Sequence, residues 1–243
     1  MLSRPQNCSE SVRAAQTRIA EACRGAHRSV DSVTLLAVSK GQSGAAIDAA
    51  AGAGIENFGE NFLQEALPKL AELTGRELTW HFIGRLQANK TRAVAENFAW
   101  VHGVDRFKIA ERLSAQRPVH APPLNLCLQL HVGGEASKGG VEAADLAQLA
   151  REVSALPRIK LRGLMSMPPA ENDVARQRHW FRETRQVFDY LNEHGHRLDT
   201  LSMGTSADFE AAIFEGSTIV RIGTAIFGPR SAKTGDETPD EKQ

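Results

Sequence analysis

The chain lacks the features that mark membrane, secreted and nucleic-acid-binding proteins. It contains no run of about 18 apolar residues, so no membrane-spanning helix is predicted. Its first residues lack the apolar segment of a secretory signal. The 29 Lys and Arg residues balance 29 Asp and Glu residues, which disfavours binding to nucleic acid or to an anionic membrane. These absences predict a cytoplasmic protein that binds neither nucleic acid nor a membrane.

Cysteine is scarce and scattered. Cys8, Cys23 and Cys127 are far apart, odd in number and without a CxxC pair. This excludes a disulfide scaffold and favours a reducing compartment. No HxH, HExxH or acidic cluster has the spacing of metal ligands, so no metal site is expected.

Short apolar runs alternate with helical segments along most of the chain. Continuous apolar runs of this length are typical of parallel strands that are covered on both faces. Eight repeated βα units favour a closed (β/α)8 TIM barrel over an open sheet, which is the alternative. The expected strands cover residues 33–40, 55–59, 78–84, 98–104, 124–132, 159–167, 198–204 and 217–223.

An additional helix precedes the first strand. Residues 9–24 place apolar side chains on one helical face, and Ser9 is positioned to cap this helix. Asp105 is expected to cap a later helix, and Phe62 to lie on the apolar face of a helix at 61–73. We expect residues 1–229 to form a single domain and the polar residues 230–243 to be a disordered tail.

Lys40 is the most unusual residue of the expected strand ends, where the active sites of such barrels lie. A lysine that faces the barrel there would be desolvated, which lowers the pKa of its amine and frees it to attack an aldehyde or ketone. The alternative is a lysine whose side chain extends into solvent.

Two loops after the seventh and eighth strands predict a phosphate site. SMGTS (202–206) and GTAIFG (223–228) are rich in glycine and hydroxyl groups, and each leads into a helix. A phosphate site opposite a nucleophilic lysine suggests a ligand with an aldehyde at one end and a phosphate at the other. Pyridoxal 5′-phosphate (PLP) is such a ligand. Arg221 could reach its pyridine nitrogen and keep that nitrogen unprotonated; the alternative is a salt bridge.

Several co-ordered segments within residues 9–228 resemble the pyridoxal phosphate homeostasis proteins. They are LLAVSK (35–40), FGENFLQEA (58–66), WHFIGRLQANK (80–90), GEASKGG (134–140), GLMSM (163–167), LSMGTSADFEAAI (201–213) and GSTIVRIGTAIFG (216–228). The resemblance implies a barrel of the alanine racemase N-terminal type. It also implies that PLP is covalently bound to Lys40 as a Schiff base.

Other cofactor-binding residues follow from the same resemblance. It implies that Lys138 takes part in PLP handling or transfer. We also place His81 at the site, although it could instead be a hydrogen-bonded core residue, as we expect for His102. The remaining expected contacts are Asn57, Met203, Gly204, Ser206, Arg221, Gly223 and Thr224.

The resemblance implies a monomeric, non-catalytic carrier that delivers PLP to apoenzymes. The alternative is a PLP-dependent amino-acid racemase. Racemases of this type carry a second, β-rich domain for which the chain leaves no room, and the single tyrosine, Tyr190, lies far from the strand ends. Racemisation needs an acid/base group on each face of the substrate, and no second base is evident. A third reading is a barrel that binds a phosphorylated metabolite without a Schiff base.

Overall fold

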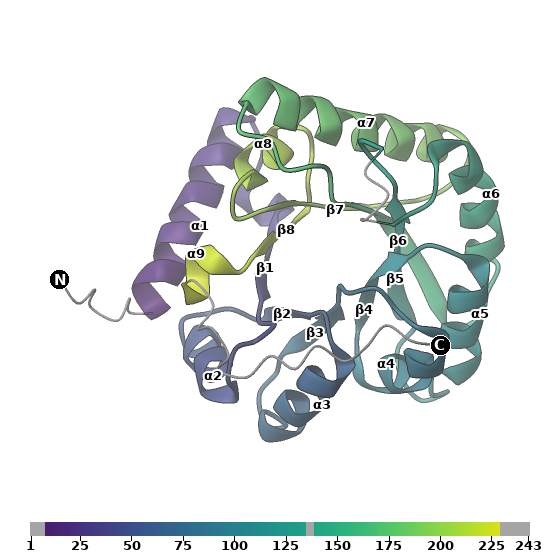
Figure 1. Ribbon diagram of the computed structural model, residues 1–243, viewed down its shortest axis with the longest axis horizontal. Coiled ribbons are helices and arrows are strands. Elements are labelled where there is room, and N and C mark those ends of the chain that lie inside the picture. Colours follow the sequence, from purple (N-terminus) through teal and green to yellow (C-terminus); the bar gives the residue numbers. More distant parts are fainter. Residues whose placement is uncertain (1–7, 135–138, 229–243) are drawn as a thin grey trace.

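The computed structural model describes residues 8–134 and 139–228. Their parallel strands form a closed barrel in chain order, from β1 to β8, with helices around the outside (Figure 1). The predicted TIM barrel is therefore confirmed. The strands are β1 (Thr34–Val38), β2 (Asn57–Glu60), β3 (Thr79–Phe82), β4 (Trp100–Val104), β5 (Leu124–Leu130), β6 (Ile159–Ser166), β7 (Thr200–Thr205) and β8 (Ile219–Ile222).

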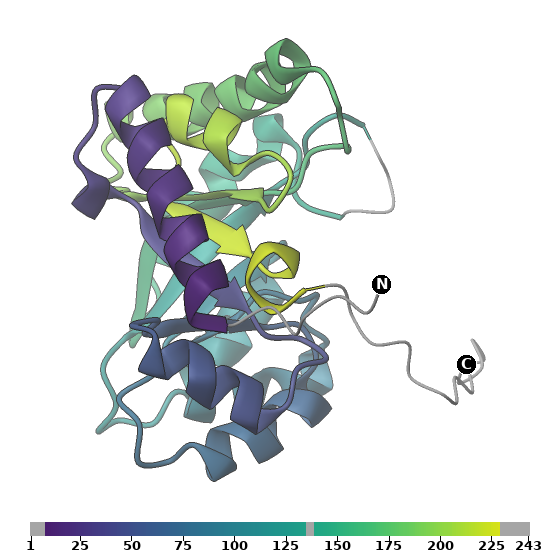
Figure 2. The ribbon, with the colours of Figure 1, turned by 90° about the vertical axis from the view of Figure 1, so that its left-hand side faces the viewer.

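The helices cover the outer face of the barrel. The additional helix α1 crosses the outside of the barrel, where it packs against α8 and α9 (Figure 2). The helices are α1 (Cys8–Gly25), α2 (Gly44–Gly52), α3 (Leu63–Glu72), α4 (Thr91–Asn97), α5 (Phe107–Gln116), α6 (Ala143–Ser154), α7 (Val174–Glu193), α8 (Phe209–Phe214) and α9 (Thr224–Phe227), with 3-10 turns η1 (Val30–Ser32) and η2 (Ala88–Lys90).

Burial explains why the apolar runs form strands. Leu36 and Ala37 of β1 are both fully buried, as are Leu126 and Leu128 of β5. Each fully buried leucine among them contributes about 1.5–3 kcal/mol to folding. Strands β1 and β8 pair in register, which closes the barrel and places the phosphate loop after β8 next to the end of β1.

Three local predictions were wrong. Helix α1 already begins at Cys8, so Ser9 lies in its first turn rather than at its cap. The cap of α5 is Arg106, and the Asp105 carboxylate instead lies 3.7 Å from the Arg106 guanidinium. Phe62 is 57% exposed because its extended backbone precedes α3 and turns the ring outward.

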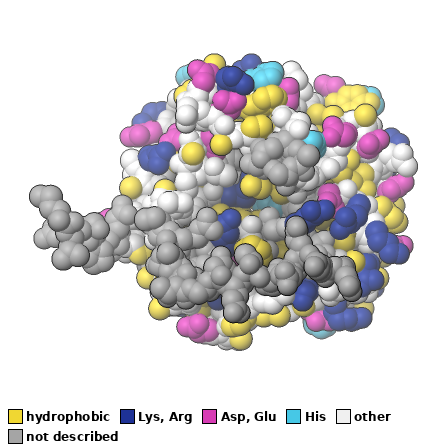
Figure 3. Space-filling model, viewed as in Figure 1, with side chains coloured by type: hydrophobic (Ala, Val, Ile, Leu, Met, Phe, Trp, Pro, Cys, Tyr) yellow, Lys and Arg dark blue, Asp and Glu magenta, His cyan; other side chains and the backbone are white. Residues whose placement is uncertain are grey.

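On the face shown in Figure 3, charged side chains of both signs are present, in line with the balanced composition. Across the described parts of the chain, no helix is both long and apolar enough to cross a bilayer. The tail expected at 230–243 lies outside the described residues.

Candidate functional site

A cavity of about 330 Å³ lies at the carboxyl ends of the strands. It brings together five residues that the sequence analysis assigned to the site, namely Lys40, Ser206, Arg221, Gly223 and Thr224. The rest of the lining is Val38, Gln42, Asn61, Ile83, Met167, Thr205, Ala207 and Gly228.

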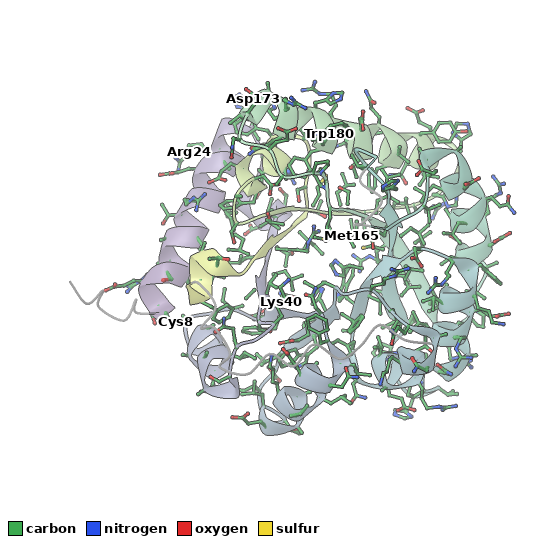
Figure 4. The ribbon with its side chains drawn as sticks, viewed as in Figure 1. Cys8, Arg24, Lys40, Met165, Asp173 and Trp180 are labelled. Carbon is green, nitrogen blue, oxygen red and sulfur yellow. The ribbon has the colours of Figure 1, made fainter. Side chains whose placement is uncertain are left out.

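Lys40 stands two residues beyond the end of β1. Its side chain is half-buried and lies on the inner side of β1, as Figure 4 shows. It therefore lines the cavity instead of extending fully into solvent. A lowered pKa for its amine stays a prediction.

The residue before Lys40 is held by a buried ion pair. Glu60 accepts hydrogen bonds from Ser39 Oγ at 2.6 Å and from Lys69 Nζ at 2.8 Å. Lys69 Nζ also donates to the Ser39 carbonyl at 2.9 Å. Burial raises the pKa of Glu60, while hydrogen bonds from Lys69 and Ser39 and the charge of Lys69 oppose that rise. This group fixes the backbone from which Lys40 projects.

Arg221 extends from β8 toward β7 and β6 and is 5% exposed. Its Nη1 donates to the Ser202 carbonyl at 2.6 Å and to Ser202 Oγ at 2.8 Å, and its Nη2 donates to the Ser166 carbonyl at 2.9 Å. These partners are neutral oxygens, so the expected alternative of a salt bridge does not describe its contacts. Burial lowers the pKa of Arg221 to about 10, and the guanidinium remains charged at pH 7.

The two loops predicted to bind phosphate meet at the cavity. Ser206 Oγ accepts a hydrogen bond from the Gly223 amide at 3.2 Å, and Thr224 opens α9. Gly204 has a φ of +92°, and a Cβ there would lie 2.6 Å from the Ala212 side chain. Glycine at this position therefore allows the end of β7 to pack closely against α8.

Four of the expected contacts are not among the lining residues. Asn57 and His81 lie deeper in the barrel, joined by a hydrogen bond of 3.0 Å. Met203 is fully buried, and Gly204 lies near the end of β7, where it packs against α8. Lys138 lies outside the described residues.

The cavity wall also contains residues that the sequence analysis did not assign to the site. Gln42 and Asn61 bring side-chain amides from the loops after β1 and β2, and Ile83 and Met167 bring apolar surface from those after β3 and β6. Their positions after strands are the only signal that could have identified them, because their residue types carry no reactive chemistry. In the described portion of the chain, no group of three or more His, Cys, Asp or Glu side chains could hold a metal ion.

Comparison with known proteins agrees with this architecture. The family model described as "Alanine racemase, N-terminal domain" matches residues 15–231. The alanine racemase of Corynebacterium glutamicum superposes with a TM-score of 0.67 at 16% identity, covering 93% of this chain and 64% of that one, which supports the fold alone. The barrel, with its cavity at the carboxyl ends of the strands, is thus a domain of the alanine racemase N-terminal class.

Relatives with higher sequence identity show to which family within this class the chain belongs. The pyridoxal phosphate homeostasis protein of Pseudomonas aeruginosa is 54% identical over 221 residues, which cover 91% of this chain and 95% of the relative. PipY of Synechococcus elongatus, solved with PLP bound, has a TM-score of 0.77 at 39% identity and covers 86% of this chain and 100% of its own. The chain belongs to the family of pyridoxal phosphate homeostasis proteins.

Proposed function

We propose that the protein binds PLP in this cavity, holds it covalently through the Lys40 amine and delivers it to apoenzymes. The observation that carries the proposal is the convergence of Lys40, Arg221 and the loops after β7 and β8 on one cavity. Relatives named as pyridoxal phosphate homeostasis proteins, and the PLP-bound structure of PipY, support the same ligand.

The residues of the cavity fit PLP in size and chemistry. The cavity volume of about 330 Å³ falls within the range of clefts that bind small molecules. The Lys40 amine would meet the aldehyde, and Arg221 would donate to the ring nitrogen. Ser206, Gly223 and Thr224 would bind the phosphate with hydroxyl and backbone N–H groups. When bound, PLP supplies the aldehyde that condenses with an amine.

Arg221 favours storage over catalysis. A charged guanidinium has only N–H donors, so it can hydrogen-bond a ring nitrogen but cannot accept its proton. The ring would then stay unprotonated and withdraw electrons weakly. The reactions of most PLP enzymes require strong electron withdrawal by this ring. We therefore propose a non-catalytic role.

A racemase is the second candidate, because the alanine racemases share the fold. Among the described lining residues, Lys40 and Arg221 are the ionisable ones, and Arg221 cannot serve as a base at neutral pH. Tyr190 is 50% exposed on α7, where its ring packs against His194. The described residues that line the cavity therefore offer one base rather than the two that racemisation needs.

A transfer assay separates the two candidates. The PLP-loaded protein is mixed with an apo-aminotransferase in the presence of a phosphatase that destroys free PLP, and aminotransferase activity is followed. The same protein is incubated with L- and D-alanine, and the enantiomers are separated. We expect activity to recover and the alanine to keep its configuration. Failure to recover would contradict delivery, and rapid interconversion of the enantiomers would favour the racemase.

A cytoplasmic location and a monomeric state stay predictions from the sequence. Cys8, Cys23 and Cys127 form no disulfide among the described residues.

A further inference from the structure

A chain of hydrogen bonds runs through the barrel interior from Arg221 to Asn57. Arg221 Nη1 contacts Ser202 Oγ at 2.8 Å, and Ser202 Oγ lies 2.8 Å from His102 Nδ1. His102 Nε2 lies 2.9 Å from His81 Nδ1, and His81 Nε2 lies 3.0 Å from Asn57 Oδ1. We call these five residues the Arg221–Asn57 chain.

The Arg221–Asn57 chain links strands on opposite sides of the barrel. Ser202 belongs to β7 and His102 to β4, and these strands face each other across the ring in Figure 1. Ser202 and His102 are fully buried, and His81 is 1% exposed. The His81 ring stacks on Trp100, with centroids 5.4 Å apart. None of the three has bulk water available to replace a lost hydrogen bond.

The Arg221 end favours one direction in which protons are donated. A guanidinium can only donate, so Ser202 Oγ must accept from Arg221. The hydroxyl hydrogen of Ser202 is then directed at His102 Nδ1. His102 in turn donates from Nε2 to His81 Nδ1, and His81 donates from Nε2 to the amide oxygen of Asn57.

The opposite direction is less favourable. It would require the Asn57 amide to be rotated, so that its NH₂ group donates to His81. Both imidazoles would then carry their proton on Nδ1, and Ser202 Oγ would accept from both Arg221 and His102. The buried hydroxyl hydrogen of Ser202 would lose its acceptor, which is costly inside a protein.

We propose that Ser202, His102 and His81 are positioning residues. With Asn57 they fix the Arg221 guanidinium as a permanent donor at the cavity, and they hold both imidazoles neutral in the Nε2–H tautomer. The Arg221–Asn57 chain ends on the amide oxygen of Asn57, which takes up no proton at neutral pH. It therefore delivers no proton to the cavity, and neither histidine acts as an acid or a base there. Only the identity of the ligand rests on the proposed function.

This arrangement gives Asn57 and His81 a role without direct ligand contact. Both were expected at the site, yet neither lines the cavity. They would act on a ligand through Arg221, which does line it. Three of these five residues are ionisable, namely Arg221 at one end and His81 and His102 in the middle.

The tautomers can be measured without any ligand. The protein is labelled with ¹⁵N-histidine, and long-range ¹H–¹⁵N spectra are recorded between pH 6 and pH 8, with His81→Gln and His102→Gln for assignment. We expect both imidazoles to remain in the Nε2–H form throughout. An Nδ1–H form in either ring, or titration of either ring in this range, would overturn the proposal.

A variant then tests the link to the cavity. Ser202→Ala removes the hydroxyl between Arg221 and His102, so we expect a mixture of His102 tautomers and about a fivefold to tenfold rise in the PLP dissociation constant. The control is Ser114→Ala, which removes another buried hydroxyl, one bonded to the Pro157 carbonyl. Unchanged tautomers and affinity in Ser202→Ala would refute the positioning role.

The two proposals fail in different ways. If the unsubstituted protein shows the expected tautomers but does not bind PLP, the proposed function is wrong and the Arg221–Asn57 chain stands. If it binds PLP but the tautomers are reversed, the chain is wrong and the function stands.

Discussion

Lowering the pH from 7 to 5 is expected to reduce the free energy of unfolding by about 4 kcal/mol, or about 2 kcal/mol for each of two buried histidines. Burial lowers the pKa of His81 to about 3. The pKa of His102 is lowered well below its usual value, mainly by burial and further by the neighbouring His81 and Arg221. In the unfolded chain, both imidazoles take up a proton near pH 6.5.

The sign follows from where the protons bind. Below about pH 6.5 the unfolded chain binds protons that the folded protein does not, so stability falls as the pH falls. The loss continues until the pH approaches the folded pKa values. Above pH 7 both states are neutral at these positions, and the contribution is fully present.

Urea unfolding at a series of pH values measures this effect. His102→Gln should retain about half of the pH dependence, because one of the two groups is removed. His120→Gln is the matched control, because His120 is exposed, and it should leave the slope unchanged. A free energy of unfolding that stays flat between pH 7 and pH 5 would show that the histidine pair is not buried and neutral.

Replacing Lys69 by Met is expected to destabilise the protein by about 3–5 kcal/mol, the usual cost of leaving one member of a buried ion pair alone. Glu60 is fully buried, and its Oε2 already has no hydrogen-bond partner among the described residues. Without Lys69, the carboxylate would keep only the Ser39 hydroxyl. The Ser39 carbonyl would also lose its bond to Nζ.

A double substitution separates the charge from the packing. In Glu60→Leu with Lys69→Met, both charges are removed, and most of the stability should return. Lys108→Met is the control, because Lys108 is exposed and pairs with Glu111 at 3.7 Å. Its loss should change stability by less than about 1 kcal/mol. A Lys69→Met variant as stable as the control would mean that the pair does not support the structure. Urea unfolding at pH 7 decides this.

Much of the fold was predictable because the strand signal is local. Apolar runs such as 33–40 and 124–132 are typical of strands that are covered on both faces, and their number favoured the closed barrel. Helix ends were less predictable. The position of Phe62 depends on a single extended residue before α3, and neighbouring residue types do not reveal that conformation.

Several residues that line the cavity were also predictable, since the carboxyl ends of all the strands lie at one end of a barrel. That rule predicted that Lys40, Arg221 and Thr224 lie close together, and in the structure they line one cavity. The contacts of His102 could not be predicted in this way. Its partner Ser202 is 100 residues away in the sequence, and the pairing depends on which strands face each other across the ring.

Reduction of the PLP-treated protein with borohydride, followed by peptide mapping, tests the central claim most directly. The protein should absorb visible light before reduction, and the pyridoxyl label should then be found on Lys40, with no label fixed in Lys40→Ala. A label on another lysine, or none on the unsubstituted protein, would contradict the account.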